Sequence, residues 1–216
     1  MDHRILVTGG LGGLATAIAH AFRTASWRVD APGRDALDVA DPASVRAWFV
    51  GRPTPDLLVC AAGSIRDRPL LRLTEADWDR VLADNLTGAA RCARAALPAM
   101  VRRGGGHIVF VSSWSAHHPP PGQAAYAAAK AGLLGLMRSL AREAGPSGIR
   151  VNAILPGFLE TNMTRKLAPE RIDAVRRAHV LGRFNHPAQV AEFLLFLEIH
   201  LPHTSGQVFQ LDSRVG

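Results

Sequence analysis

The glycine-rich turn near the N-terminus constrains the fold of this 216-residue chain more than any other stretch. A short aliphatic run at 5–7 leads into the turn, and residues 15–25 are predicted to form a helix. Glycines let a backbone approach a pyrophosphate, and a helix N-terminus supplies N–H donors and a positive dipole end. The turn therefore predicts a nucleotide-binding cradle formed by Gly9, Gly10, Leu11, Gly12, Gly13 and Leu14. A plain strand-to-helix turn is the alternative.

The remainder of the chain alternates between strand patterns and helix patterns. Further strands are predicted at 27–30, 56–60, 107–111, 149–155 and 207–211, with helices starting near 41, 73, 123 and 187. This alternation is typical of an α/β fold with a doubly wound parallel sheet. We expect a single domain over 1–216, with a cofactor half at about 1–112 and a catalytic and substrate half at about 113–216.

The residues after the second predicted strand bear on the choice of dinucleotide. In dinucleotide-binding folds an acid at this point holds the ribose 2′-hydroxyl, whereas an arginine accommodates a 2′-phosphate. Arg34 follows the strand here, which favours NADPH, while Asp30 and Asp35 keep NADH as an alternative. Too little chain separates Arg34 from Asp38 for a crossover helix, so this region is shortened.

A second group of candidate residues lies in the middle of the chain. Tyr126 is the only tyrosine, and it precedes Lys130, one of two lysines, by four residues on a predicted helix. A nearby ammonium group lowers the pKa of a phenol, which would help Tyr126 to give its proton to a carbonyl oxygen as hydride arrives. Ser113, just after a predicted strand, could hydrogen-bond the same oxygen. An ordinary surface Tyr and Lys would have the same spacing.

Composition narrows the function classes further. The formal charge is +7, but the arginines are scattered and no basic run alternates with aromatic residues. This disfavours nucleic acid and favours an anionic ligand or an acidic protein partner. No apolar run reaches the ~18 residues of a membrane span. With no signal peptide pattern and no disulfide pattern in Cys60 and Cys92, we expect a cytoplasmic protein. His117-His118 lacks a further ligand at a suitable spacing, so no metal is expected.

Together these motifs resemble the short-chain dehydrogenase/reductase family over nearly the whole chain. The glycine turn resembles the family's cofactor loop, and Trp78 to Asn85 resembles its mid-chain helix signature. Ser113 with Tyr126 and Lys130 resembles its catalytic set, and 156–161 resembles the segment that closes over the nicotinamide. The second half is most similar to 3-oxoacyl-[acyl-carrier-protein] reductases. The resemblance implies a Rossmann fold and NADPH-dependent reduction of a ketone, carried as a 3-oxoacyl thioester on a small molecule or a carrier protein.

The resemblance also implies roles for single residues. Tyr126 would donate the proton, Lys130 would lower the pKa of Tyr126 and hold the ribose, Ser113 would orient the carbonyl, and Asn85 would hold a water for proton relay. The remaining cofactor contacts would come from Arg34, Asp38, Val39, Ala61, Ala62, Gly63, Pro156, Gly157, Leu159 and Thr161, beside Tyr126 and Lys130 themselves. The helices around Asn85 and Tyr126 would form the contacts of a homodimer or homotetramer.

The chain also departs from the family pattern. Ala15 stands where a third glycine is usual, and Cys60-Ala61-Ala62-Gly63 replaces Asn-Asn-Ala-Gly. The segment after the second strand is shorter than usual, which could weaken cofactor binding. Two other hypotheses therefore stay open. One is the same chemistry on another small ketone, alcohol or nucleotide sugar, and the other is a non-catalytic nucleotide-binding subunit.

Overall fold

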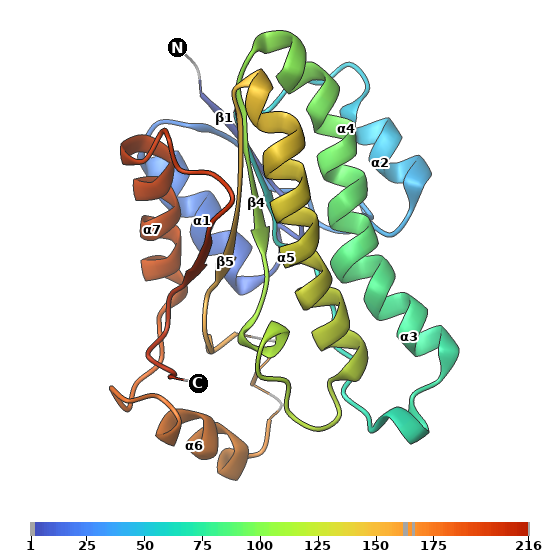
Figure 1. Cartoon of the computed structure of the whole chain (residues 1–216), viewed down its shortest axis with the longest axis vertical. Coiled ribbons are helices and arrows are strands. Elements are labelled where there is room, and N and C mark those ends of the chain that lie inside the picture. The colour runs from blue at the N-terminus through green and yellow to red at the C-terminus, as the bar shows by residue number, and fades with distance from the viewer. Residues whose placement is uncertain (1–2, 162–163, 166, 216) are drawn as a thin grey trace.

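A six-stranded parallel sheet lies at the centre of the computed structural model, which describes residues 3–161, 164–165 and 167–215 (Figure 1). The strand order is β2-β1-β3-β4-β5-β6, and every neighbouring pair is parallel. The strands are β1 (Arg4–Val7), β2 (Arg28–Asp30), β3 (Leu57–Cys60), β4 (Gly106–Val111), β5 (Ile149–Leu155) and β6 (Val208–Gln210). The predicted α/β class with a doubly wound parallel sheet is confirmed.

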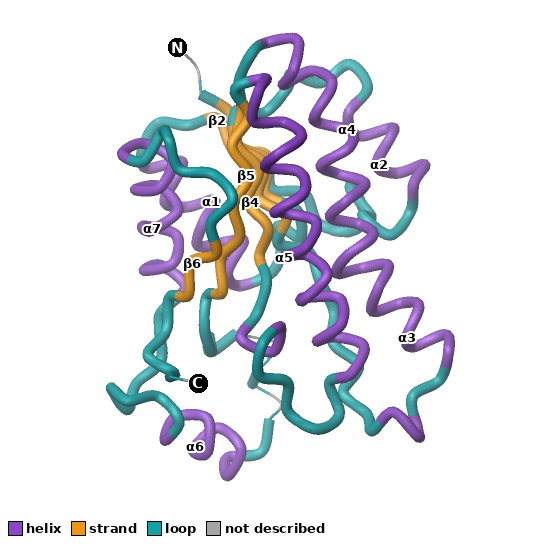
Figure 2. The backbone as a smooth tube through the Cα atoms, in the orientation of Figure 1, coloured by secondary structure: helices purple, strands orange, loops and turns teal. Residues whose placement is uncertain are grey.

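Helices cover both faces of this sheet, as Figure 2 shows. One face carries α1 (Gly13–Thr24) and α7 (Pro187–His200), and the other carries α2 (Pro42–Phe49), α4 (Gly88–Arg103) and α5 (Ala124–Ala144). The helix α3 (Glu75–Leu82) precedes α4, and α6 (Pro169–Arg177) lies beyond the carboxyl ends of the strands. Short 3₁₀ turns occupy Leu70–Arg72, Trp114–Ala116 and Gly145–Ser147.

The four central strands, β1, β3, β4 and β5, are buried on both sides, which explains their nearly continuous apolar sequences. Alternate residues of β3 enter different clusters: Leu58 packs toward α4 and α5, whereas Leu57 and Val59 pack toward α1 and α7. All four residues of β3 are buried. Burial at this level makes the strand ends rigid supports for the loops that follow them.

The helix predicted to start near 73 contains a π-helical turn. The chain is helical without a gap through α3, the π turn at Ala83–Thr87 and α4. The Thr74 side chain caps α3 by accepting a hydrogen bond from the Asp77 N–H at 3.1 Å. The π turn contains Asn85, and such turns often occur at functional sites because they redirect a side chain.

The strand order also locates a crevice. Strand β1 has β2 on one side and β3 on the other, so the chain reverses its direction of winding at this point. Ligands of doubly wound folds bind outside the carboxyl ends of the strands at such a switch point. Among the described residues no helix is long and apolar enough to cross a membrane.

Candidate active site

The glycine turn closes tightly on its neighbours at the switch point. The Thr8 hydroxyl accepts hydrogen bonds from the N–H groups of Ala61 and Ala62, each at 3.1 Å, which joins the end of β1 to the end of β3. Gly9 has a φ of 71°, and a Cβ there would lie 2.8 Å from the Ala62 Cα. A Cβ on Gly10 would lie only 2.0 Å from the Ala31 carbonyl oxygen. These two positions therefore require glycine.

The same turn leads into the exposed start of a helix. Gly12 is the N-cap of α1 and has no side chain to cap the first N–H groups. A Cβ on Gly13 would lie 3.1 Å from Thr161 Cγ2, so Thr161 lies directly over the helix start. Leu14 is half-buried, and Leu11 is largely exposed. Uncapped N–H groups and a backbone without side chains fit a pyrophosphate, which is the group that the predicted cofactor would place here.

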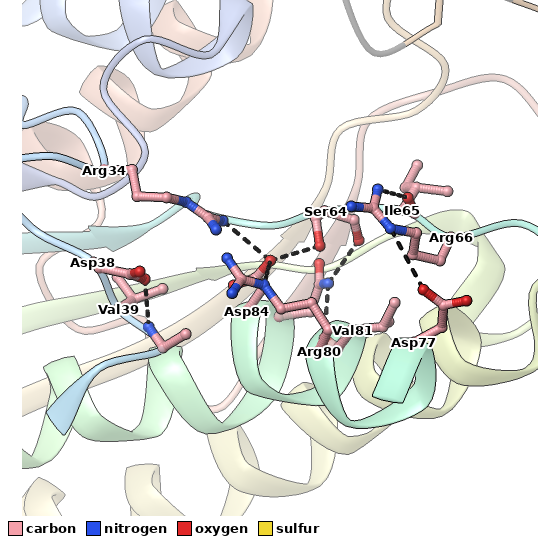
Figure 3. Close-up of polar contacts among 12 residues, drawn as sticks. Arg34, Asp38, Val39, Ser64, Ile65, Arg66, Asp77, Arg80, Val81 and Asp84 are labelled. Atoms are coloured by element: carbon pink, nitrogen blue, oxygen red, sulfur yellow. Dashed lines mark hydrogen bonds and ion pairs between the residues drawn. The ribbon is translucent and has the colours of Figure 1, made fainter. Parts of the chain in front are cut away.

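The residues predicted to contact the adenine end lie on the α4 side of the crevice. Val39 is 4% exposed and packs against Gly88 of α4, while the Asp38 carboxylate accepts a hydrogen bond from the Ala40 N–H at 3.0 Å. Arg34 extends across this region and forms an ion pair with Asp84 at 3.1 Å (Figure 3). Its guanidinium therefore has a partner within the protein.

Asp30 and Asp35, the two acidic residues that left NADH as an alternative cofactor, differ in their surroundings. The carboxylate of Asp30, at the end of β2, forms an ion pair with Arg4 at 2.9 Å. Asp35 is exposed in the turn that follows Arg34. A carboxylate already paired with an arginine is less available to accept a hydrogen bond from a ribose hydroxyl. Asp30 is therefore the weaker candidate of the two for binding the ribose of NADH.

Ser113 and Tyr126 meet beyond the end of β4. Ser113 caps the 3₁₀ turn Trp114–Ala116 by accepting a hydrogen bond from the Ser115 N–H at 3.2 Å. Its hydroxyl also hydrogen-bonds the phenol of Tyr126, which lies in the first turn of α5. Burial raises the pKa of Tyr126 to about 12, the Ser113 hydrogen bond lowers it, and the nearby Asp67 carboxylate adds to the rise. The pKa is thus higher than its ordinary value, contrary to our expectation from the Tyr–Lys spacing, because burial outweighs the other effects.

Lys130 lies one helical turn further along α5 and is 5% exposed. Its Nζ is 5.5 Å from the centroid of the Tyr126 ring and donates a hydrogen bond to the Val111 carbonyl oxygen at 2.9 Å. The neighbouring Ser112 hydroxyl bonds the Lys130 carbonyl at 2.8 Å. Burial lowers the pKa of Lys130 to about 8, an effect that Cys60 partly offsets. The Val111 carbonyl therefore holds the ammonium at the end of β4, and the Ser112 hydroxyl ties the backbone of α5 to the same strand end.

Asn85 completes the group from the π turn. Its side-chain amide donates to the carbonyl oxygens of Ser64 at 2.8 Å and Val81 at 2.9 Å. Its Oδ1 is buried and has no hydrogen-bond partner among the described residues. A Cβ on Gly63 would lie 2.4 Å from this oxygen and 3.6 Å from Lys130 Nζ. The absence of a side chain at Gly63 thus leaves Asn85 and Lys130 facing the same small space.

The predicted closing segment begins at the end of β5. Gly157 has a φ of 84°, and a Cβ there would lie 2.6 Å from the Asp212 Cβ, so the segment is packed against the C-terminal strand region. The Asn185 amide donates to the carbonyl oxygens of Pro156 and Leu211, which joins the two. Leu159 is 7% exposed among the residues under α1 and α7. Of this segment, Thr161 is the residue that reaches the glycine turn.

The structure adds residues that the sequence motifs did not single out for this site. Two of them are Asp84 and Arg214. The Arg214 guanidinium lies 4.6 Å from the ring centroid of Trp114, the residue that follows Ser113 in the sequence. It also forms an ion pair with Asp212 at 2.5 Å. His118 also stacks on Trp114, with ring centroids 4.2 Å apart. The sequence offered no signal for Asp84, because Asp77, Arg80 and Arg91 lie along the same helical face and make it polar. No three His, Cys, Asp or Glu side chains of the described part of the chain gather as a metal site.

Comparison with known proteins gives a consistent assignment. A family model described as enoyl-(acyl carrier protein) reductase matches residues 13–213. The chain is 41% identical over 158 residues to the 3-oxoacyl-[acyl-carrier-protein] reductase FabG of Thermotoga maritima, covering 73% of this chain and 64% of that protein. It is 44% identical over 155 residues to the (3R)-3-hydroxyacyl-CoA dehydrogenase of Mus musculus, covering 71% of this chain and 59% of that protein. The matched region thus spans less than two thirds of these two relatives.

Solved structures agree with this match along almost the full chain. A structure described provisionally as an NAD(P)-dependent gluconate 5-dehydrogenase from Beutenbergia cavernae, with NADP bound at low occupancy, superposes with a TM-score of 0.91. It is 29% identical and covers 98% of this chain and 95% of that one. A structure described provisionally as a gluconate dehydrogenase from Agrobacterium tumefaciens has a TM-score of 0.90 at 28% identity, covering 98% and 94%.

Proposed function

The chain belongs to the short-chain dehydrogenase/reductase family, and from this membership we propose that it is an NADPH-dependent oxidoreductase that reduces a ketone to a secondary alcohol. The proposed substrate is a 3-oxoacyl thioester. One relative is named for the reduction of 3-oxoacyl-[acyl-carrier-protein] and the other for the dehydrogenation of 3-hydroxyacyl-CoA. A 3-hydroxyacyl thioester is the alcohol that corresponds to a 3-oxoacyl thioester, so both names support the choice.

One observation carries the proposal. Ser113, Asn85 and the pair Tyr126 and Lys130 come from three different segments, yet they lie around one space next to the glycine turn. A nucleotide-binding protein without catalysis would need the glycine turn but would have no use for a phenol, a hydroxyl and an ammonium placed beside it. This convergence favours an enzyme over a non-catalytic nucleotide-binding subunit.

Each residue of the site would have its own role in reducing the carbonyl group. Bound NADPH would supply the hydride that reaches the carbonyl carbon. The Ser113 hydroxyl would hydrogen-bond the carbonyl oxygen and orient it toward the Tyr126 hydroxyl. Because burial raises the pKa of Tyr126 to about 12, the phenol is protonated at neutral pH and can donate that proton as negative charge develops on the oxygen.

Lys130 and Asn85 would support this transfer. At neutral pH the ammonium of Lys130 carries its charge, because its pKa of about 8 still lies above 7. Its positive charge near the ring favours the phenolate that forms when Tyr126 gives up its proton. The buried, unpartnered Oδ1 of Asn85 faces the same space and would accept a hydrogen bond from a water that returns the proton.

The cofactor would lie along the carboxyl edge of the sheet. The glycine turn and the start of α1 would hold the pyrophosphate, with Ala61, Ala62 and Gly63 under the adjoining ribose. Asp38, Val39 and Arg34 would hold the adenosine end. The residues predicted at the nicotinamide end are Pro156, Gly157, Leu159 and Thr161, with Tyr126 and Lys130 beside them.

The test is oxidation of NADPH and NADH with an acetoacetyl thioester, followed by the near-ultraviolet absorbance of the reduced cofactor. Replacing Tyr126 by Phe is expected to lower turnover by at least about 10²-fold, because general acid catalysis contributes about that much. Binding of the cofactor, measured by fluorescence, should stay within about twofold, since the ring and its packing are kept. Turnover that does not change in the Tyr126→Phe protein would refute the catalytic assignment.

A different ketone is the second candidate. The solved structures with the high TM-scores above are described as gluconate dehydrogenases, which supports a small polyhydroxy substrate as an alternative. A panel of acyl thioesters, sugar acids and simple ketones separates the two. The candidate with the larger Tyr126-dependent kcat/KM is the substrate class, and a sugar acid in that position would displace the thioester.

The proposal extends to partners and location. The net charge of +7 would suit an acidic carrier protein that delivers the acyl chain. We expect a homodimer or homotetramer built on α4 and α5, and action in the cytoplasm. Light scattering on the purified protein measures the assembly, and a monomeric mass would contradict it.

A further inference from the structure

A buried carboxylate lies at the adenosine end of the crevice (Figure 3). The side chain of Asp84 is 1% exposed, and its Oδ2 accepts contacts from Ser64 Oγ at 2.7 Å, Arg34 Nη2 at 3.1 Å and Arg80 Nε at 3.1 Å. Its Oδ1 is buried without a hydrogen-bond partner among the described residues. Two guanidinium groups and one hydroxyl thus share a single oxygen atom.

The contact between Arg34 and Asp84 crosses the place where a dinucleotide would enter. Arg34 follows β2, next to Gly33, and a Cβ on Gly33 would lie 2.8 Å from Leu11 of the glycine turn. Ser64, which shares Asp84 with Arg34, follows the end of β3. Since β1 lies between β2 and β3 in the sheet, this ion pair runs over the carboxyl end of β1.

The geometry allows Arg34 to exchange partners. Its side chain is 49% exposed, so the guanidinium can move away from Asp84 into solvent. When it does, Asp84 keeps the contacts from Arg80 and Ser64, and its buried charge is not left alone. The movement of Arg34 therefore does not carry the full free-energy cost of leaving a buried carboxylate unpaired. Without the contacts from Arg80 and Ser64, that cost would hold Arg34 on Asp84.

We propose that Asp84 sets the preference between NADPH and NADH by competing with the 2′-phosphate of the cofactor for the Arg34 guanidinium. This inference rests on the role proposed above for Arg34. A dianionic phosphate must displace Asp84 from Arg34, and the free energy of that contact is lost from the binding of NADPH. A 2′-hydroxyl makes no such demand on Arg34, so the binding of NADH carries no corresponding loss.

The expected effect is moderate because the contact is half exposed. Ion pairs of this kind change an equilibrium by about two- to fivefold. Replacing Asp84 by Asn keeps the shape and the hydrogen bonds that its oxygen can accept, but removes the charge. The variant should therefore bind 2′-phosphorylated nucleotides about two- to fivefold more tightly. Its affinity for the other nucleotides should stay nearly unchanged.

The experiment measures binding by titration calorimetry, with adenosine 2′,5′-bisphosphate and 5′-AMP as probes and then with NADPH and NADH. The unchanged protein is compared with Asp84→Asn and with Asp84→Ser, which is smaller and gives a second variant if the amide is poorly accommodated. Thermal unfolding verifies that each variant is folded. Adding Arg34→Gln to Asp84→Asn should abolish the gain for the bisphosphate, because the gain acts through Arg34.

Asp77 supplies the matched control. It lies on the preceding helix α3 and contacts Arg66 at 3.8 Å and Arg68 at 3.5 Å, but not Arg34. Asp77→Asn removes the same charge from the same region and should leave the ratio of the two affinities unchanged. If Asp77→Asn raises the affinity for the bisphosphate as much as Asp84→Asn does, the gain is a general effect of charge. That result would overturn the proposal.

Three further outcomes have distinct meanings. If Arg34→Gln alone weakens the bisphosphate while both Asp84 variants leave it unchanged, the role of Arg34 stands and the competition by Asp84 is refuted. If the unchanged protein binds none of the four nucleotides, both the proposed function and this inference fail. A loss of 5′-AMP and NADH binding in Asp84→Asn would also overturn the inference, because it would make Asp84 a direct ligand of the ribose.

Discussion

Replacing Lys130 by Met is expected to change the free energy of unfolding in opposite directions at neutral and at high pH. Burial lowers the pKa of Lys130 from its ordinary value of 10.5 to about 8. At 1.36 kcal/mol for each pH unit, this gap means that the charged side chain costs the folded protein about 3 kcal/mol at neutral pH. The side chain is 5% exposed, so solvent screens little of this cost.

The pH dependence follows from proton counts. Between pH 8 and 10.5 the unfolded chain holds the Lys130 proton while the folded protein has released it, so stability rises with pH through this window. Methionine removes the cost but also removes the hydrogen bond from Nζ to the Val111 carbonyl, a loss of about 1–2 kcal/mol. The variant should therefore be more stable than the unchanged protein by about 1–2 kcal/mol at neutral pH, and less stable by a similar amount near pH 11.

Urea unfolding at both pH values measures these differences, with the midpoint and the slope fitted separately. Arg138→Met is the control, because Arg138 lies two turns further along α5 with its side chain exposed. It should show little change at either pH. A Lys130→Met protein that is destabilised equally at both pH values would refute the reasoning, since it would mean that the ammonium is not disfavoured by its surroundings.

Three further substitutions test other parts of the fold. Gly10→Ala places a Cβ about 2.0 Å from the Ala31 carbonyl oxygen and should cost about 2–3 kcal/mol in urea unfolding and abolish nucleotide binding. Gly135→Ala, in α5 with open space around it, should instead stabilise by about 0.5–1 kcal/mol, and a loss there would contradict the helix argument. Burial lowers the pKa of His107 despite its bond to Glu198, so stability should fall as pH drops below 6.5. His107→Gln should flatten that slope in melting curves, and an equal slope would exclude His107 as the cause.

The sheet and the glycine turn were predictable because they depend on local patterns. Apolar strand segments and the glycines of the turn reflect burial and backbone geometry within a few residues, and the structure keeps nearly the predicted strand positions. The same holds for Tyr126 and Lys130, because four residues along any helix give one face. The alternation of strands and helices predicted a parallel sheet. In such a sheet Ser113, which follows a strand, lies at the same edge as the start of the helix that carries Tyr126 and Lys130.

Other features depend on contacts that no local pattern reveals. Asp84 lies 50 residues from Arg34, and nothing near either residue indicates that they form a pair. The raised pKa of Tyr126 likewise depends on the protein groups that surround the phenol, so the spacing to Lys130 alone gave the opposite direction. The π turn around Asn85 lies inside a continuous helix, and the residue pattern that predicts this helix does not mark where the turn widens.

The two outer strands of the sheet, β2 and β6, are each only three residues long. Unpaired backbone groups at the margin of a sheet can recruit strands from other molecules, and short margins limit that hazard. A second molecule adding a strand to either side would gain few backbone hydrogen bonds. This arrangement guards the protein against aggregation by strand addition, and it leaves the helical faces as the more favourable places for copies of the chain to associate.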